Sequence, residues 1–474
     1  MYLVAANMTL VATQADHEAI PASIFRAYDI RGIAELQLSK DSVRLIGQAI
    51  GSEALDQNIA TLLIGYDGRL SSPSLSIALI EGIRSSGCNV VSLGLIPTPL
   101  LYFATHTTDF DSGVMLTASH NPSNYNGLKV VFHQTSLAEN QIQSLRSRIE
   151  TNRLRTGDGG FDELDIDKLY IEDICRRIKL EQPLKVVVDC GNAVPGKVAP
   201  VLLGALGCDV YPIFCEIDGN FPNHHPDPTV PKNLVALAAT VLEKKADVGV
   251  ALDGDGDRVG LITNLGNFVD ADRMLMLLVQ AIVPNFPNRA VVYDVKCSSK
   301  LGTLIAESGA LPVMHRSGHS FMKQKMQEAN AILGGEFAAH IFIRDDWFGF
   351  DDGMYVAARL LKILSESSKT SDELFDQFDT GFSTSEIKIE VAEERKFLLM
   401  EQLLELADFP AAKQITLDGL RVEYADGWGL IRASNTSPAL LLRFEADTQT
   451  RLLEIQNQFK ALLRSADKDL EIGF

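Results

Sequence analysis

Three aspartates lie close together in the segment 249–260, which reads GVALDGDGDRVG. Asp253, Asp255 and Asp257 follow a run of apolar residues and are separated by single glycines. Carboxylates that alternate along a glycine-rich loop can converge on one hard cation, because glycine permits the backbone angles this needs. An EF-hand is excluded, since its sixth position would be Arg258, where glycine is required. The segment therefore predicts a divalent-metal site with room for phosphate oxygens.

A second candidate is Ser119 in the segment 117–122, Thr-Ala-Ser-His-Asn-Pro. It follows a buried-looking strand, and side chains at such strand ends face the ligand crevice of α/β proteins. No Gly-x-Ser-x-Gly pattern surrounds it, so a hydrolase elbow is not indicated. The adjacent His120 rarely has the geometry of a serine–histidine base pair. Taken alone, Ser119 is better interpreted as a loop or capping serine.

Residues suited to phosphate recur at other predicted strand ends and loops. A serine that carries a phosphoryl group needs a divalent metal, cations for the substrate's own phosphate and a group that handles the acceptor's proton. The candidates are Tyr28, Arg31, Lys129, Lys296, His319, Glu336, His340, Arg432, Ser434, Asn435 and Thr436. Glu336 and His340 would share one face if their segment is a helix. Each residue has an ordinary structural alternative, so the hypothesis depends on their occurrence together.

Three segments that position these residues repeat one pattern. Each has an apolar strand followed by aspartate, a turn, an amphipathic helix closed by glycine, and a second apolar strand. The segments are 61–94, 184–213 and 289–320. Gly87, Gly207 and Gly309 stand where helix C-caps belong. A strand, a crossover helix and a strand form a right-handed βαβ unit, so we expect three tandem α/β domains with mixed sheets.

The last hundred residues follow a different pattern. Two alternating runs flank Asp418-Gly419, which indicates a hairpin, and an apolar helical face runs through 450–465. These features predict a smaller α+β domain, a sheet backed by helices. We predict an N-terminal extension over 1–20 and domains over 21–165, 166–267, 268–379 and 380–474.

Composition limits the classes of partner. The formal net charge of −19 disfavours binding to nucleic acid or anionic membranes, because the long-range field repels polyanions. No basic n-region of a signal peptide and no uninterrupted apolar stretch of bilayer length are present. The six cysteines are scattered without a Cys-x-x-Cys pair. We expect a cytoplasmic monomer with no nucleic-acid or membrane partner.

Taken in order, these motifs resemble the bacterial phosphomannomutase/phosphoglucomutases of the α-D-phosphohexomutase family. The resemblance runs from about Ile24 to the final helix, and the combination of 117–122 with 253–258 is highly specific. It implies four domains around a central cleft. It also implies the reversible conversion of mannose 1-phosphate or glucose 1-phosphate to the 6-phosphate, through a phosphoserine and a hexose 1,6-bisphosphate that is both intermediate and activator.

The resemblance also implies roles for individual residues. Ser119 would be the phosphoserine, and Mg²⁺ would be held by an oxygen on Ser119 together with Asp253, Asp255 and Asp257. Lys129 or Arg31 would be the proton acceptor or electrostatic partner, His120 is a weaker candidate, and His340 is a candidate acid/base. Substrate would be contacted by Tyr28, Arg258, Lys296, His319, Glu336 and His340, and its non-transferred phosphate by Arg432, Ser434, Asn435 and Thr436.

One departure concerns the sugar-recognition loop. The family's Gly-Glu-Met-Ser-Gly-His is replaced here by a loop with Phe337, Ala338 and Ala339 between Glu336 and His340. Two alternatives therefore stay open beside the hexose mutase. One is a phosphoglucosamine mutase, although the Tyr28 segment and residues 432–436 favour the hexose branch. The other is a non-catalytic phosphosugar-binding protein, which would not require a nucleophile beside a metal.

Overall fold

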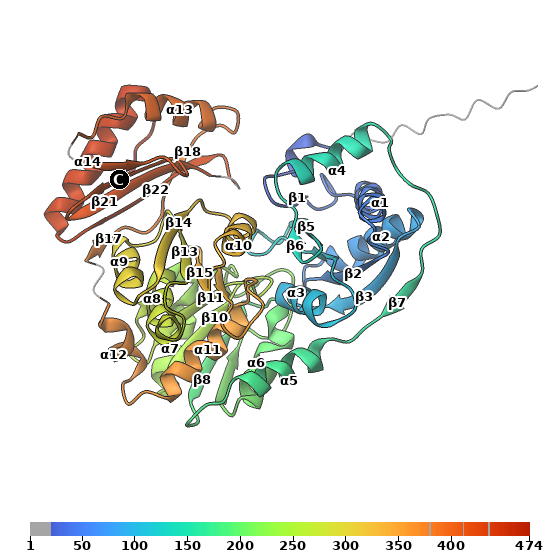
Figure 1. Cartoon of the computed structure of the whole chain (residues 1–474), viewed down its shortest axis with the longest axis horizontal. Coiled ribbons are helices and arrows are strands. Elements are labelled where there is room, and N and C mark those ends of the chain that lie inside the picture. The colour runs from blue at the N-terminus through green and yellow to red at the C-terminus, as the bar shows by residue number, and fades with distance from the viewer. Residues whose placement is uncertain (1–19, 379–380, 411, 435–436) are drawn as a thin grey trace, which may run out of the picture.

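The structure, a computed structural model, describes residues 20–378, 381–410, 412–434 and 437–474. Its strands form four sheets that follow one another along the chain (Figure 1). We call each sheet with its helices a unit, numbered first to fourth in chain order. The predicted extension over 1–20 lies outside the described residues except for Ile20.

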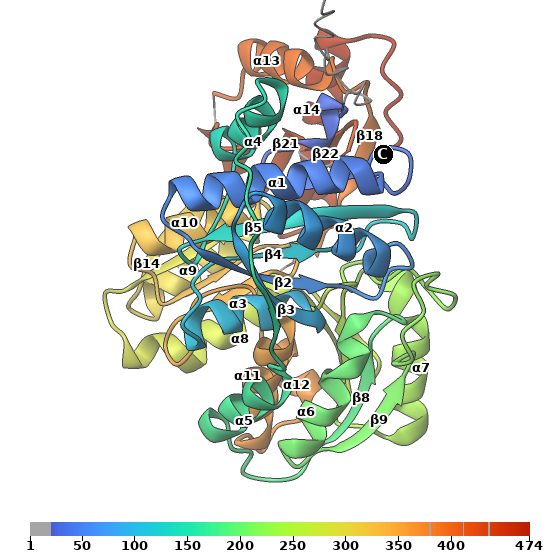
Figure 2. The ribbon, with the colours of Figure 1, turned by 90° about the vertical axis from the view of Figure 1, so that its right-hand side faces the viewer.

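The first unit has a mixed sheet of order β1-β5-β4-β2-β3-β7, with β6 paired to β5. Its strands are β1 (Ile30–Ile33), β2 (Thr61–Tyr66), β3 (Asn89–Leu95), β4 (Gly113–Leu116), β5 (Tyr125–Phe132), β6 (Thr135–Ser136) and β7 (Phe161–Glu163). Its helices are α1 (Lys40–Asp56), α2 (Ser72–Ser85), α3 (Thr98–Thr107) and α4 (Asn140–Glu150). Helix α1 buries Val43, Ile46 and Ile50, a helical spacing. Helices α1 and α2 cover one face of the sheet and α3 the other (Figure 2).

The second unit has the sheet order β12-β11-β10-β8-β9, and the third has β14-β13-β15-β16. The second contains α5 (Asp167–Arg177), β8 (Lys185–Asp189), α6 (Ala199–Ala205), β9 (Asp209–Ile213), α7 (Val235–Lys244), β10 (Val248–Leu252), β11 (Val259–Thr263) and β12 (Phe268–Val269). The third contains α8 (Ala271–Ile282), β13 (Ala290–Asp294), α9 (Ser299–Glu307), β14 (Leu311–His315), α10 (His319–Glu328), β15 (Leu333–Gly335), β16 (Ile341–Ile343), α11 (Gly353–Ser365) and α12 (Ser371–Asp376).

The predicted helix ends are confirmed in all three α/β units. Gly87, Gly207 and Gly309 have φ of +94°, +94° and +90° and follow α2, α6 and α9. These left-handed angles suit glycine, which has no Cβ to clash, and they turn the chain back into the next strand.

The fourth unit is an antiparallel sheet of order β17-β22-β21-β20-β19, with β18 also paired to β22. Its elements are β17 (Phe382–Ser383), β18 (Ile387–Glu390), α13 (Lys396–Leu406), β19 (Lys413–Ile415), β20 (Leu420–Tyr424), β21 (Gly427–Ala433), β22 (Ala439–Ala446) and α14 (Gln449–Ala466). The hairpin at Asp418-Gly419 is confirmed, with Gly419 at φ +81°. Three α/β units and one smaller α+β unit therefore match the predicted fold class.

The first three units share a hydrophobic core, and the fourth unit has a separate one. One cluster of buried apolar side chains runs through parts of the first three units, whereas the fourth unit has a core of its own. In Figure 1 the fourth unit lies above the third, at the upper left, and the first unit lies at the right. Within the described residues, no helix combines the length and the apolar character that a membrane crossing needs.

Candidate active site

Ser119 lies in the turn after β4, and its hydroxyl faces the second unit. Only 2% of the residue is exposed, and its Oγ donates a hydrogen bond to Asp253 Oδ2 at 2.7 Å. Its φ of +49° is left-handed, which is uncommon for a residue with a side chain. His120 Nδ1 lies 3.2 Å from the same Oγ, so these neighbours do make contact, contrary to our expectation. Burial, together with the charge of Arg258, lowers the pKa of His120 well below its usual value.

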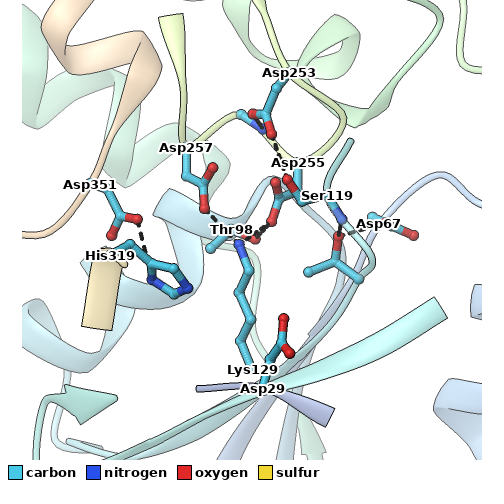
Figure 3. Close-up of polar contacts among 12 residues, drawn as sticks. Asp29, Asp67, Thr98, Ser119, Lys129, Asp253, Asp255, Asp257, His319 and Asp351 are labelled. Carbon is cyan, nitrogen blue, oxygen red and sulfur yellow. Dashed lines mark hydrogen bonds and ion pairs between the residues drawn. The ribbon is translucent and has the colours of Figure 1, made fainter. Parts of the chain in front are cut away.

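The three aspartates lie in the loop between β10 and β11 and are completely buried. Asp253, Asp255 and Asp257 each offer an oxygen within 4.8 Å of the others. A Cβ at Gly254 would lie 2.2 Å from the Ser119 carbonyl oxygen, so glycine allows the loop to pack directly on the serine. Oδ1 of Asp255 and Oδ1 of Asp257 are buried without a hydrogen-bond partner. Buried, unpaired carboxylate oxygens that converge in this way fit a divalent cation (Figure 3).

Lys129 reaches the same carboxylates from β5. Its Nζ lies 2.7 Å from Asp255 Oδ2 and 2.6 Å from Asp257 Oδ2 (Figure 3). Burial alone would lower the pKa of Lys129, but the two carboxylates raise it well above its usual value. Burial and the neighbouring carboxylates raise the pKa of Asp253. The lysine is therefore held as a cation among the acidic groups, which favours an electrostatic role over that of a proton acceptor.

Arg258 connects the aspartate loop to the third unit. Its Nε donates to His340 Nε2 at 2.9 Å, so that ring nitrogen is the unprotonated one. His340 Nδ1 lies 3.0 Å from Asp351 Oδ2, a close contact whose geometry is not that of a hydrogen bond. His319 Nδ1 is 3.6 Å from the same Asp351 oxygen, and burial lowers the pKa of His319 well below its usual value. Two imidazoles thus lie around one buried carboxylate.

Arg31 and Tyr28, two predicted site residues of the first unit, line the same cleft as Ser119. Arg31 Nη2 pairs with Asp29 Oδ2 at 2.5 Å, and its Nη1 donates to Asn121 Oδ1 at 2.7 Å. The ring of Tyr28 meets that of His319 edge-on, with centroids 5.0 Å apart. Residues of the first and third units are therefore in contact beside Ser119.

The segment with Glu336 and His340 is a turn between β15 and β16, and the helix considered for it is not formed. The short antiparallel strand pair leaves five residues to reverse direction, which is too few for a helix. Glu336 Oε1 accepts from the Gly318 backbone N–H at 2.6 Å, and burial raises the pKa of Glu336. Lys296 Nζ lies 3.4 Å from Glu386 Oε2, so the cation is paired with a carboxylate of the fourth unit.

The predicted phosphate-binding segment is partly described. Arg432 Nε donates to Asp418 Oδ2 at 2.9 Å, and Ser434 is buried. Asn435 and Thr436 lie outside the described residues.

One cleft brings the described candidates together. Its volume is about 570 Å³, and residues of all four units line it. Candidates among them are Tyr28, Arg31, Ser119, His120, Lys129, Arg258, Lys296, His319, Glu336, His340, Arg432 and Ser434. The three aspartates lie beneath this lining, beside Ser119 and Lys129.

Sequence reasoning missed several residues of this cleft. Asp227 and Thr229, in the loop before α7, and Glu386 line it but were not proposed. The nearby His-His-Pro-Asp-Pro run at 224–228 was the available signal for the first two. Glu386 has no motif of its own, because its role as the partner of Lys296 exists only in the folded chain.

Four family models match the chain in succession. All four describe phosphoglucomutase/phosphomannomutase: alpha/beta/alpha domain I over residues 22–156, domain II over 168–266, domain III over 270–380 and the C-terminal domain over 386–462.

Individual relatives match over almost their full length. A phosphomannomutase/phosphoglucomutase of Pseudomonas aeruginosa is 49% identical over 96% of this chain and 98% of its own. A phosphoglucomutase of Neisseria gonorrhoeae is 44% identical over 94% of this chain and 98% of its own. The crystal structure of a phosphoglucomutase/phosphomannomutase family protein from Burkholderia thailandensis is 42% identical, with a TM-score of 0.92 over 96% of this chain and 100% of that one.

These matches span all four units and include every sequence motif from which the resemblance was inferred. The chain therefore belongs to the α-D-phosphohexomutase family of phosphoglucomutases and phosphomannomutases.

Proposed function

We propose that this protein is an isomerase that moves a phosphoryl group between the 1- and 6-oxygens of glucose and mannose. The observation that carries the proposal is Ser119, whose Oγ lies 2.7 Å from Asp253 in a cleft lined by cations from every unit. The names of the relatives, phosphomannomutase/phosphoglucomutase and phosphoglucomutase, support both sugars as substrates. We also propose a cytoplasmic monomer, in keeping with six free cysteines.

Transfer would occur in two half-reactions at Ser119. The phosphoserine P–O bond breaks as the free sugar hydroxyl bonds to phosphorus, which gives a hexose 1,6-bisphosphate. The bisphosphate then turns around, and Ser119 takes back its other phosphoryl group. The transition state is loose and negatively charged, so positioning and cationic groups supply most of the acceleration.

The residues around Ser119 suit this chemistry. Lys129 stays charged beside the reacting group, and Arg258 lies between the aspartate loop and His340. We propose His340 as the acceptor of the sugar hydroxyl's proton, which requires that Arg258 Nε first release the His340 Nε2 to which it donates. A Mg²⁺ ion would be held by Asp253, Asp255, Asp257 and an oxygen on Ser119, and when bound it offsets charge on the phosphoryl oxygens.

The far side of the cleft would hold the sugar and its second phosphate. We propose that Glu336 accepts hydrogen bonds from sugar hydroxyls, and that Lys296, His319 and Tyr28 contact the substrate. Arg432, Ser434, Asn435 and Thr436 would bind the non-transferred phosphate, since arginine and hydroxyl donors match several phosphate oxygens.

Phosphorus NMR tests the reaction directly. The purified protein, with Mg²⁺ and trace glucose 1,6-bisphosphate, is offered the 1-phosphates of glucose, mannose and glucosamine separately. We expect 6-phosphates from the first two, no conversion after EDTA treatment, and no conversion by Ser119→Ala. Conversion of glucosamine 1-phosphate alone would identify a phosphoglucosamine mutase. Binding of all three sugars without conversion would identify a non-catalytic phosphosugar-binding protein.

A further inference from the structure

The backbone of Ser119 is held in a conformation that its side chain disfavours. The φ of +49° lies in the left-handed region, where a non-glycine residue is strained and persists only when its surroundings impose the conformation. The neighbouring chain must therefore supply contacts that fix the turn after β4.

Arg69 provides the largest set of these contacts. It lies between β2 and α2, is 1% exposed, and uses all five of its N–H donors. Nη2 donates to the carbonyl oxygens of Ser119 and Asn121, both at 2.6 Å. Nη1 donates to the carbonyl oxygens of Pro122 at 2.6 Å and Tyr125 at 3.0 Å. Four of the five bonds thus end on the backbone of one turn, 119–125.

Asp67, in the same segment between β2 and α2 as Arg69, adds further hydrogen bonds around Ser119. Its Oδ2 accepts from Arg69 Nε at 3.2 Å and from Thr117 Oγ1 at 2.7 Å. Thr117 Oγ1 in turn accepts the backbone N–H of Ser119 at 2.9 Å. Figure 3 shows Asp67 beside Ser119. The amide and the carbonyl of Ser119 are therefore both bonded, directly or through Thr117, to one buried ion pair.

Residues of the second unit pack against the ion pair of Arg69 and Asp67. The Arg69 guanidinium lies 5.2 Å from the centre of the Phe221 ring. A Cβ at Gly219 would lie 2.9 Å from Arg69 Cα, so this loop packs tightly on the arginine. The ion pair is consequently enclosed between two units, where water cannot replace its bonds.

We propose that Arg69, Asp67 and Thr117 are positioning residues that hold Ser119 left-handed, so that its Oγ points at Asp253. This inference rests on the proposed phosphoryl transfer at Ser119. A displacement of about 1 Å at a reacting atom can cost on the order of 100-fold in rate, so loss of one bond in this set should slow transfer without removing the substrate site.

Thr117 offers the sharpest test, because Thr117→Val keeps the side-chain volume and removes the hydroxyl, whereas Thr117→Ser keeps the hydroxyl. Each protein is mixed with glucose 1,6-bisphosphate and Mg²⁺, and phosphate on Ser119 is followed by rapid quench and mass spectrometry. We expect at least a tenfold slower rate for Thr117→Val, with the wild-type final stoichiometry and a KM for glucose 1-phosphate within twofold. Thr117→Ser should react within threefold of wild type.

A buried threonine of the same unit serves as the control. Thr105 is 1% exposed, and its hydroxyl bonds only within α3 and to the neighbouring His106. We expect Thr105→Val to phosphorylate at the wild-type rate. A wild-type rate for Thr117→Val, or a stoichiometry that falls in proportion to its rate, would overturn the inference. If wild-type Ser119 never takes phosphate, the proposed function itself is wrong.

Arg69→Lys is the second variant, since one ammonium cannot replace five planar donors. Arg148→Lys is its match: Arg148 is largely buried in the same unit and also donates to a carbonyl oxygen, that of Arg153. We expect Arg69→Lys to slow Ser119 phosphorylation at least tenfold more than Arg148→Lys. Equal slowing in both would mean general destabilisation and would contradict a positioning role.

Discussion

Ala339 stands at a backbone position that favours glycine. Its φ is +69°, and it lies in the turn that joins Glu336 to His340. The related family loop has glycine at this place, so the alanine introduces strain into a loop that lines the cleft. A left-handed angle costs an L-residue about 1–2 kcal/mol of folding stability. Glycine avoids this cost, but its greater conformational freedom in the unfolded chain offsets part of the gain.

We predict that Ala339→Gly raises the free energy of unfolding by about 0.5–1 kcal/mol. The control is Ala338→Gly, at a neighbour whose backbone is not left-handed. That change should lower stability by a similar amount, because it adds only unfolded-state freedom. Urea denaturation of the three proteins at one pH measures both effects. Destabilisation by Ala339→Gly would show that the buried methyl group of Ala339 contributes more to stability than the backbone strain costs.

The role of a single residue was predictable from the sequence where its partners lie nearby in the chain. The closely spaced Asp253, Asp255 and Asp257 are recognisable because three carboxylates so near one another need a cation. Arg69 was not recognisable, because its role depends on carbonyl oxygens about fifty residues away. A basic residue in a turn is usually solvated, and nothing local distinguishes this one.

At the scale of elements, helix α11 begins on a buried carboxyl group. Asp352 Oδ1 accepts the backbone N–H of Tyr355 at 2.9 Å, and Tyr170 of α5 donates to the same side chain. The residue is 1% exposed, and burial raises its pKa from 3.8 to about 7. The folded protein therefore keeps a proton on Asp352 between these pH values, and the unfolded chain does not.

Stability should consequently fall as pH rises from about 4 to about 7, by up to about 1.4 kcal/mol per pH unit from this group. Asp352→Asn keeps the capping oxygen but cannot ionise. We predict that the stability of this variant relative to wild type increases with pH over that window and levels off above it. Urea unfolding at several pH values, followed by tryptophan fluorescence, measures the difference.

Elements were predictable where their signals are local. The strand–helix–strand repeats and the glycines that end α2, α6 and α9 follow from periodicity and backbone angles within each segment. The turn between β15 and β16 was not predictable, because its five residues have a helix-compatible spacing. The pairing of these strands, together with that of β15 with β13, decides their conformation.

At the scale of the whole molecule, the fourth unit contacts the third through a small apolar cluster, in which Trp428 and Leu430 pack against Val295, and through polar contacts. Its core is separate, and Arg421 Nη1 donates to the carbonyl oxygens of Val295 and Cys297 at 2.6 and 2.8 Å. These residues flank Lys296, so the fourth unit holds the backbone on either side of a cation that faces the cleft. The segment 383–386, between β17 and β18 of this unit, also lines the cleft and brings Glu386 to Lys296.

Glu386 should therefore compete with the substrate's phosphate for Lys296. Removing its charge leaves the cation available, and an ion pair of this exposure is worth up to about 1 kcal/mol. We predict that Glu386→Gln tightens glucose 1-phosphate binding roughly threefold at 50 mM salt, with a smaller effect at 500 mM because salt screens the pair. Isothermal titration calorimetry on the metal-loaded protein measures both dissociation constants.

Glu390→Gln separates this local competition from the effect of net charge. Glu390 lies on the same stretch of chain but is exposed, and it pairs with the surface Lys388 at 3.2 Å. Both variants remove one negative charge from the molecule, so a purely long-range effect would tighten binding equally in the two. We expect Glu390→Gln to bind as wild type does. Weaker binding by Glu386→Gln would instead mean that Glu386 contacts the sugar directly, and that the connection between β17 and β18 forms part of the substrate site.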